Sequence, residues 1–235
     1  KLKTLPTRFR FISADNIKPN VINYKNPFSK KKFELIYKNQ FSVPISKYNK
    51  PIISNSNIKN KIILDGSINI NETTVYDDVV EIKAGTTFYI DNGASIIFKN
   101  KLTALGTNEN PISFTKKNIK EWGTIALQGE GTKNSILDNI FFDGGSGHIY
   151  KNIKYTGALS IHDTKNIIIK NINMKNNKTF DDMLHIVYVD NIEIENIQIE
   201  NSFMDAIDID MSTQVVLKNI IIKQAGNDGI DLMES

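Results

Sequence analysis

The chain of 235 residues carries 29 basic and 26 acidic side chains, for a net charge of +3, and 40% of its residues are hydrophobic. It has no cysteine, which excludes disulfides, cysteine-ligated zinc and thiol catalysis. No apolar run approaches the roughly 18 residues that a membrane span needs, so we expect no span. Because the sequence begins at Lys1 and stops inside a patterned segment at Ser235, we interpret it as a processed or excised piece of a longer chain.

The first segment, residues 1–58, lacks the repeat found later in the chain. Residues 1–60 hold 13 basic and 2 acidic side chains, a net charge of +11, together with several prolines and aromatic residues. We predict a cap or linker here, because the open end of a stacked sheet must be covered. A basic, aromatic stretch is also compatible with nucleic acid, but no known nucleic-acid-binding motif accompanies it, and we expect no such partner.

The later part of the chain repeats itself. Three segments, 157–174, 182–199 and 205–222, share one pattern, and a fourth copy opens at residue 228, so the steps are 25, 23 and 23 residues. Apolar residues alternate with polar ones within each copy, which is typical of strands. One copy cannot bury its own apolar face, whereas stacked copies bury a continuous one. The repeat therefore predicts an all-β fold, a right-handed single-stranded parallel β-helix, over residues 59–235.

One asparagine recurs at the middle of each copy, at Asn171, Asn196 and Asn219. Asparagine tolerates left-handed backbone at corners, and stacked amides can bond to one another from coil to coil. We therefore predict a structural asparagine ladder rather than a catalytic role.

The upstream coils carry a more specific pattern, which includes Ala84-Gly85-Thr86, Gly106-Thr107, Trp122-Gly123-Thr124-Ile125 and Phe142-Asp143-Gly144-Gly145. This succession resembles the coil signature of bacterial secreted and surface β-helix proteins, the pectin-lyase-like superfamily in the broad sense, over about residues 79–235. The resemblance implies the same fold, a polysaccharide partner, and an extracellular, cell-surface or periplasmic location. It specifies a fold better than a reaction.

Acidic residues gather in the last coils: residues 181–235 hold 12 acidic side chains and two lysines, a net charge of −10. With the copies in register, three lanes of equivalent positions run from coil to coil near the carboxyl end. We expect the first lane to face solvent, because its members alternate with inward apolar residues. The lanes are Ser160, His185, Asp208 and Asp231; His162, Val187, Asp210 and Met233; and Gly157, Asp182, Asp205 and Asp228.

Stacked carboxylates about 4.8 Å apart repel one another and require relief. One alternative is Ca²⁺, which would bridge carboxylates from adjacent coils, with Asp182, Asp205, Asp208, Asp228 and Asp231 as candidate ligands. A second is a carboxylic acid that keeps its proton, as a general acid must. A third is that the side chains splay into water and only prevent edge association.

Glycoside hydrolysis needs two carboxyl groups, and we select Asp205, Asp208 and Asp228 as candidates, with His185 as a candidate base or ligand. These coils are loosely similar to the Asp-bearing coils of polygalacturonase-type hydrolases, although the Gly-His-Gly and Arg-x-Lys segments of that family are missing. Lyases and epimerases of the superfamily use an Arg or Lys base, and the acidic lane contains no Arg. A Ser160–His185–Asp208 triad lacks any oxyanion-hole motif.

The sequence thus predicts an extracellular polysaccharide-interacting β-helix, with hydrolase or lyase/epimerase activity at the acidic lane. The alternative is a non-catalytic structural or adhesin-like surface module. A cleft flanked by aromatic or basic side chains beside Asp205 and Asp208 would favour the enzyme, and a smooth acidic face would favour the module.

Overall fold

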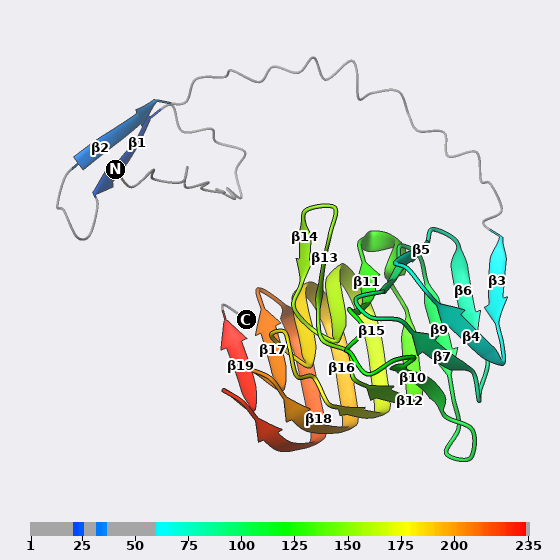
Figure 1. Cartoon of the computed structure of the whole chain (residues 1–235). Coiled ribbons are helices and arrows are strands. Elements are labelled where there is room, and N and C mark those ends of the chain that lie inside the picture. Colours follow the sequence, from blue (N-terminus) through cyan, green and yellow to red (C-terminus); the bar gives the residue numbers. More distant parts are fainter. Residues whose placement is uncertain (1–20, 26–31, 37–59, 234–235) are drawn as a thin grey trace. The chain divides into compact units, whose positions relative to one another are not determined.

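The computed structural model describes residues 21–25, 32–36 and 60–233 (Figure 1). The chain divides into two compact units, Lys1–Asn57 and Ile58–Ser235. In the first unit, β1 (Val21–Lys25) pairs antiparallel with β2 (Lys32–Ile36). The predicted cap or linker role of residues 1–58 falls mostly on residues outside the described ones and stays a prediction.

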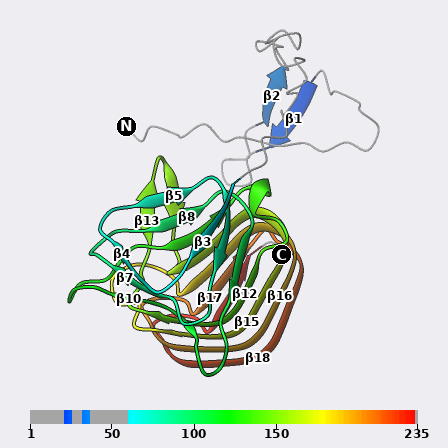
Figure 2. The same cartoon turned by 90° about the vertical axis from the view of Figure 1, so that its right-hand side faces the viewer.

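The second unit is a parallel β-helix, as predicted (Figure 1). Fifteen strands form one sheet that winds from coil to coil, and Figure 2 shows the successive coils stacked behind one another. The strands are β3 (Lys61–Leu64), β4 (Ser67–Ile70), β5 (Thr74–Tyr76), β6 (Val79–Ile82), β7 (Thr87–Ile90), β8 (Ile96–Phe98), β9 (Leu102–Leu105), β10 (Ile112–Lys116), β11 (Ile125–Gln128), β12 (Ile136–Asp143), β15 (Leu159–Lys175), β16 (Leu184–Ser202), β17 (Ile207–Asp210), β18 (Thr213–Ala225) and β19 (Ile230–Met233).

Two further elements interrupt the coils. A short 3₁₀ turn, η2 (Glu130–Thr132), follows β11, and an antiparallel hairpin joins β13 (His148–Tyr150) to β14 (Ile153–Tyr155). None of the described residues forms a helix long and apolar enough to cross a membrane.

The strand register confirms the repeat read from the sequence. Leu159 of β15 pairs with Leu184 of β16, which pairs with Ile207 of β17, which pairs with Ile230 of β19. The steps between partners are the 25, 23 and 23 residues of the sequence repeat. Equivalent side chains of successive coils are therefore direct neighbours in the sheet.

The predicted asparagine ladder is present at one corner of the coils. Asn171, Asn196 and Asn219 have positive φ angles of 54°, 57° and 54°, so each turns the chain in the left-handed region. The side-chain amide of Asn196 donates to Oδ1 of Asn171 at 3.0 Å, and that of Asn219 donates to Oδ1 of Asn196 at 3.0 Å. Two further ladders, which the sequence analysis missed, join Asn166 to Asn191 and Asn176 to Asn201.

The core is a continuous column of aliphatic and aromatic side chains inside the coils. Phe114 stacks between Phe88 and Phe142, with ring centroids 4.7 and 5.0 Å apart, and all three rings are buried. Burying a large apolar side chain contributes about 1.5–3 kcal/mol, and each coil adds several. This column makes the outer faces of the coils a rigid support for any site built on them.

Candidate functional site

The first lane, which contains Ser160, His185, Asp208 and Asp231, changes from apolar to polar side chains along the stack of coils. Its apolar half lies under the β13–β14 hairpin, where Tyr155 packs with Ile97 and Ala126 in a small outer cluster. Its polar half follows on the next coils. In register order, the lane is Val75, Ile97, Ala126, Ser160, His185, Asp208 and Asp231. The hairpin therefore covers the apolar part of the lane, and the polar part of the lane lies beyond the edge of the hairpin.

The prediction that this lane faces solvent is wrong for two of its members. Ser160 is fully buried, and His185 is only 7% exposed. The Ser160 hydroxyl hydrogen-bonds within its own turn, to the backbone of Gly157, and also contacts Thr124 Oγ1 at 3.3 Å. These contacts make Ser160 a structural residue in a covered part of the outer face, which alternation in the sequence cannot reveal.

At the polar end, three side chains from two adjacent coils converge, and we name His185, Asp208 and Asp210 the His–Asp cluster. Nε2 of His185 lies 3.8 Å from Oδ2 of Asp208 and 3.6 Å from Oδ2 of Asp210. One possible ligand atom from each of the three residues lies within 4.8 Å of the others. His185 comes from β16, whereas both carboxylates come from β17, whose alternation puts residues 208 and 210 on the same outer face.

A second histidine supports the cluster from the covered side. Nδ1 of His185 lies 3.1 Å from Nε2 of His162, and the two rings meet edge to face. The ring of His162 also contacts that of Tyr155, with centroids 5.0 Å apart. Burial lowers the pKa of His162 to about 3, with a smaller contribution from His185. His162 is therefore neutral and holds the His185 ring in place.

The cluster is electrostatically strained. Burial, together with the smaller effects of the neighbouring carboxylates of Asp210 and Asp231, raises the pKa of Asp208 to about 6. Burial lowers the pKa of His185, although the carboxylate of Asp210 opposes this effect. Oδ1 of Asp208 and Oδ1 of Asp210 are buried and have no hydrogen-bond partner. A group that supplies positive charge or protons here would relieve both carboxylates.

The other predicted acidic residues lie outside the cluster. Asp182 is 1% exposed, and burial is the main cause that raises its pKa to about 7. Oδ1 of Asp205 accepts hydrogen bonds from the Asp228 backbone amide at 2.8 Å and from the Asn227 side-chain amide at 2.9 Å, so Asp205 fixes a turn. Asp228 is exposed, and Asp231 is half-buried beside Asp208 in the register. The roles predicted for these four residues as ligands or catalysts stay predictions.

Asp210 is the member of the cluster that the sequence analysis did not select, although it placed this residue in the second lane. The signal was available in the strand periodicity, because residues two apart on one strand share a face. The first and second lanes are separate rows in the sequence repeat, and the His185 ring joins them because its Nε2 lies near both Asp208 and Asp210. Among the described residues, these three form the grouping of His and Asp side chains best placed to hold a metal ion.

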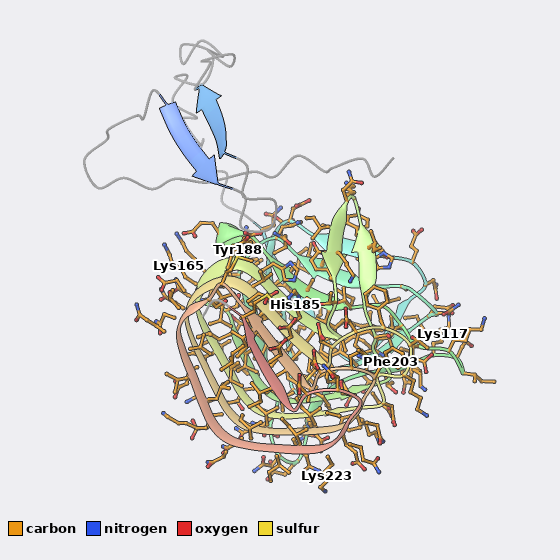
Figure 3. All side chains as sticks on the ribbon, turned by 90° about the vertical axis from the view of Figure 1, so that its left-hand side faces the viewer. Lys117, Lys165, His185, Tyr188, Phe203 and Lys223 are labelled. Carbon is orange, nitrogen blue, oxygen red and sulfur yellow. The ribbon has the colours of Figure 1, made fainter. Side chains whose placement is uncertain are left out.

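A shallow, open groove lies beside the β13–β14 hairpin, and Figure 3 labels Phe203, which lines it. It is lined by the side chains of Ile149, Lys154, Thr179, Phe180, Asp181, Phe203 and Met204, and we name it the Phe203 groove. Phe203 is 48% exposed, and Lys154 pairs with Asp181 at 3.4 Å. The charge of Asp181 contributes to raising the pKa of Asp208, so the groove lies within electrostatic reach of the cluster.

Comparison of the chain with protein-family models and with curated proteins finds no match.

Proposed function

We propose that this protein is an extracellular or cell-surface β-helix that binds a polysaccharide in the Phe203 groove and hydrolyses it at the His–Asp cluster. The observation that carries the proposal is the position of two partly buried carboxyl groups beside an exposed aromatic groove. The criterion set from the sequence was a cleft flanked by aromatic or basic side chains beside Asp205 and Asp208; the pair proposed here instead joins Asp208 to Asp210, because Asp205 is bonded to the Asn227–Asp228 turn.

The groove has the chemistry that a sugar chain requires. The exposed ring of Phe203 offers a flat apolar surface on which the C–H face of a sugar ring can pack, whereas Lys154 already lies over the ring of Phe180. Lys154, Asp181 and Thr179 add polar groups that can bond to sugar hydroxyls. The lining is mainly apolar with a few polar groups, and this composition is typical of ligand sites. The rigid coils beneath it would present successive subsites to a polymer.

The spacing of the two carboxyl groups favours one stereochemical course. Possible ligand oxygens of Asp208 and Asp210 lie within 4.8 Å of each other. Retaining glycosidases place their carboxyl groups about 5–5.5 Å apart, whereas inverting enzymes need about 6.5–9.5 Å to admit a water molecule. We therefore assign retention. One carboxylate attacks the anomeric carbon, and the other carboxyl group gives its proton to the departing glycosidic oxygen. Water then cleaves the resulting ester bond.

Hydrolysis also fits the described side chains better than β-elimination or epimerisation does. Those reactions use a basic side chain to remove a proton beside a carboxylate. The described residues contain no arginine, and Lys154, the lysine that lines the groove, is paired with Asp181.

The experiment is a screen of neutral and uronate-containing polysaccharides. Release of reducing ends would report hydrolysis, and absorbance of unsaturated uronate would report elimination. We expect reducing ends without new absorbance, and we expect Asp208→Asn and Asp210→Asn to lose turnover by at least 100-fold. Glu200→Gln on β16 removes the same charge outside the cluster and should retain activity.

Two results of this screen would contradict the hydrolase proposal. Unsaturated products would replace it with lyase chemistry. Glycan binding without turnover in any sample would favour the non-catalytic surface module.

A further inference from the structure

We infer that the His–Asp cluster binds one divalent first-row transition metal of the Zn²⁺ type, through Nε2 of His185 and one carboxylate oxygen each of Asp208 and Asp210. This inference concerns an ion and not a glycan, so it goes beyond the proposed function and can be tested without any substrate.

The spacing of the three atoms suits a small metal ion. Zn²⁺ binds imidazole nitrogen at about 2.0–2.1 Å and carboxylate oxygen at about 2.0–2.2 Å, and tetrahedral geometry then places two ligands about 3.4 Å apart. The observed Nε2–Oδ2 distances are 3.8 and 3.6 Å. They are too long for hydrogen bonds, but small side-chain rotations would bring all three atoms to one centre. Three protein ligands would leave an open fourth position, as in catalytic zinc sites.

The histidine pair supplies an independent observation. His185 is 7% exposed, its Nδ1 lies 3.1 Å from Nε2 of His162, and its Nε2 is directed at the two carboxylates. In the tautomer in which His185 donates its Nδ1 hydrogen to His162, Nε2 of His185 presents its lone pair toward the two carboxylates. This is the arrangement that a metal ligand needs, because metal-bound histidines typically donate their other ring hydrogen to a neighbouring acceptor.

Buried carboxylate oxygens without a hydrogen-bond partner also support a metal site. Oδ1 of Asp208 and Oδ1 of Asp210 are buried without a hydrogen-bond partner, and so is Oδ2 of the nearby Asp182. Burying a carboxylate without a partner is costly, and a bound cation offsets that cost. His162, Asp208 and Asp210 would thus act together with His185 as a preformed site rather than as a random patch of surface acids.

The donor set also selects among cations. Ca²⁺ takes six to eight oxygen ligands, and the cluster offers two carboxylates and an imidazole. Imidazole with carboxylate suits Zn²⁺ and its first-row neighbours better. The Ca²⁺ expected from the sequence remains a separate prediction for the acidic lanes, and competition between the two ions distinguishes them.

The test is metal uptake by the full chain after removal of metal with a chelator. Equilibrium dialysis against Zn²⁺, Mn²⁺, Ca²⁺ or Mg²⁺, with the metal measured by mass spectrometry, should give one Zn²⁺ per chain that excess Ca²⁺ does not displace. His185→Ala and Asp210→Asn should weaken Zn²⁺ binding at least 100-fold. His162→Gln should weaken it about 10- to 100-fold, as expected for a group that orients a ligand. Glu200→Gln is the control with unchanged binding.

A second measurement does not require the variants to fold. The chain contains three histidines, so ¹⁵N spectra of the imidazole rings can be assigned in the unaltered protein. Zn²⁺ should shift Nε2 of His185 and leave His148, on the β13–β14 hairpin, unchanged. No Zn²⁺ uptake, uptake unchanged in His185→Ala, or a shift at His148 alone would overturn the inference.

Turnover separates this inference from the proposed function. Asp208 and Asp210 cannot bind a metal and act as an acid–nucleophile pair at the same time, so Zn²⁺ should inhibit hydrolysis. Activation by Zn²⁺ would support the metal site and refute the carboxylate pair. Hydrolysis that Zn²⁺ does not affect, in a chain that takes up no Zn²⁺, would refute the metal site alone.

Discussion

Asp182 provides a test of how the acidic coils are built, because it combines a buried carboxyl group with an oxygen that has no partner. Its folded-state pKa is raised to about 7 from an ordinary value of 3.8, mainly by burial. The folded protein therefore binds this proton more tightly than the unfolded chain does. The stability that comes from the protonated form is complete below about pH 4 and is lost as the pH rises to about 7.

The size of the effect follows from the shift. A difference of about 3 pKa units corresponds to about 4 kcal/mol as an upper limit, at about 1.4 kcal/mol per unit. Asp182→Asn keeps the shape of the side chain and removes the titration. We expect the free energy of unfolding of the variant, relative to the parent, to rise by up to about 4 kcal/mol between pH 4 and pH 8.

Urea unfolding at several pH values between 4 and 8 measures this difference. Asp65→Asn, which removes an exposed carboxylate near the other end of the coils, is the matched control and should show little change with pH. A constant difference between Asp182→Asn and the parent across this range would refute the reasoning, because it would mean that Asp182 is not a buried titrating group.

Three further predictions concern the coils and the groove. Ile194→Asp places an unpaired charge in the fully buried core and should lower the free energy of unfolding by about 4 kcal/mol or more. Urea unfolding measures this loss. An unfolding midpoint equal to that of the parent would mean that Ile194 does not point into the core. Asn196→Ala should lower the free energy of unfolding by about 1–3 kcal/mol, because it removes ladder hydrogen bonds and places alanine at a positive φ angle. Asn196→Gly should lose less, and an equal loss in the two variants would contradict a backbone contribution. Phe203→Ala should weaken glycan binding at least 10-fold in calorimetry without changing the melting temperature, and unchanged affinity would remove the groove from the site.

The fold was predictable because its determinants are local and repeated. Alternating apolar residues at steps of 25, 23 and 23 residues define both the strands and the partners of each strand, and Asn171, Asn196 and Asn219 mark one shared corner. In a solenoid each coil contacts only its neighbours, so few contacts join residues that are far apart in the sequence. The same periodicity correctly brought His185 and Asp208 into adjacent positions.

The site was less predictable, because it depends on what covers the coils. The β13–β14 hairpin interrupts the repeat and places Tyr155 against the His162 ring. Ser160, which periodicity alone assigns to an outward face, is buried against Gly157 and Thr124. Asp205 has a favourable position in the lane, but its carboxylate bonds to the Asn227–Asp228 turn. The contact between the His162 and His185 rings depends on side-chain orientation across two lanes, which is not encoded in strand spacing.

The most direct test of the central claim is the anomeric configuration of the first product, followed by proton NMR on the polysaccharide that the screen identifies. The short distance between the Asp208 and Asp210 carboxyl groups predicts that the newly released reducing end keeps the configuration of the cleaved bond. Asp208→Asn and Asp210→Asn should release no product over the same period. An inverted product, or a retained product that both variants still form, would show that the His–Asp cluster is not where this protein cleaves its glycan.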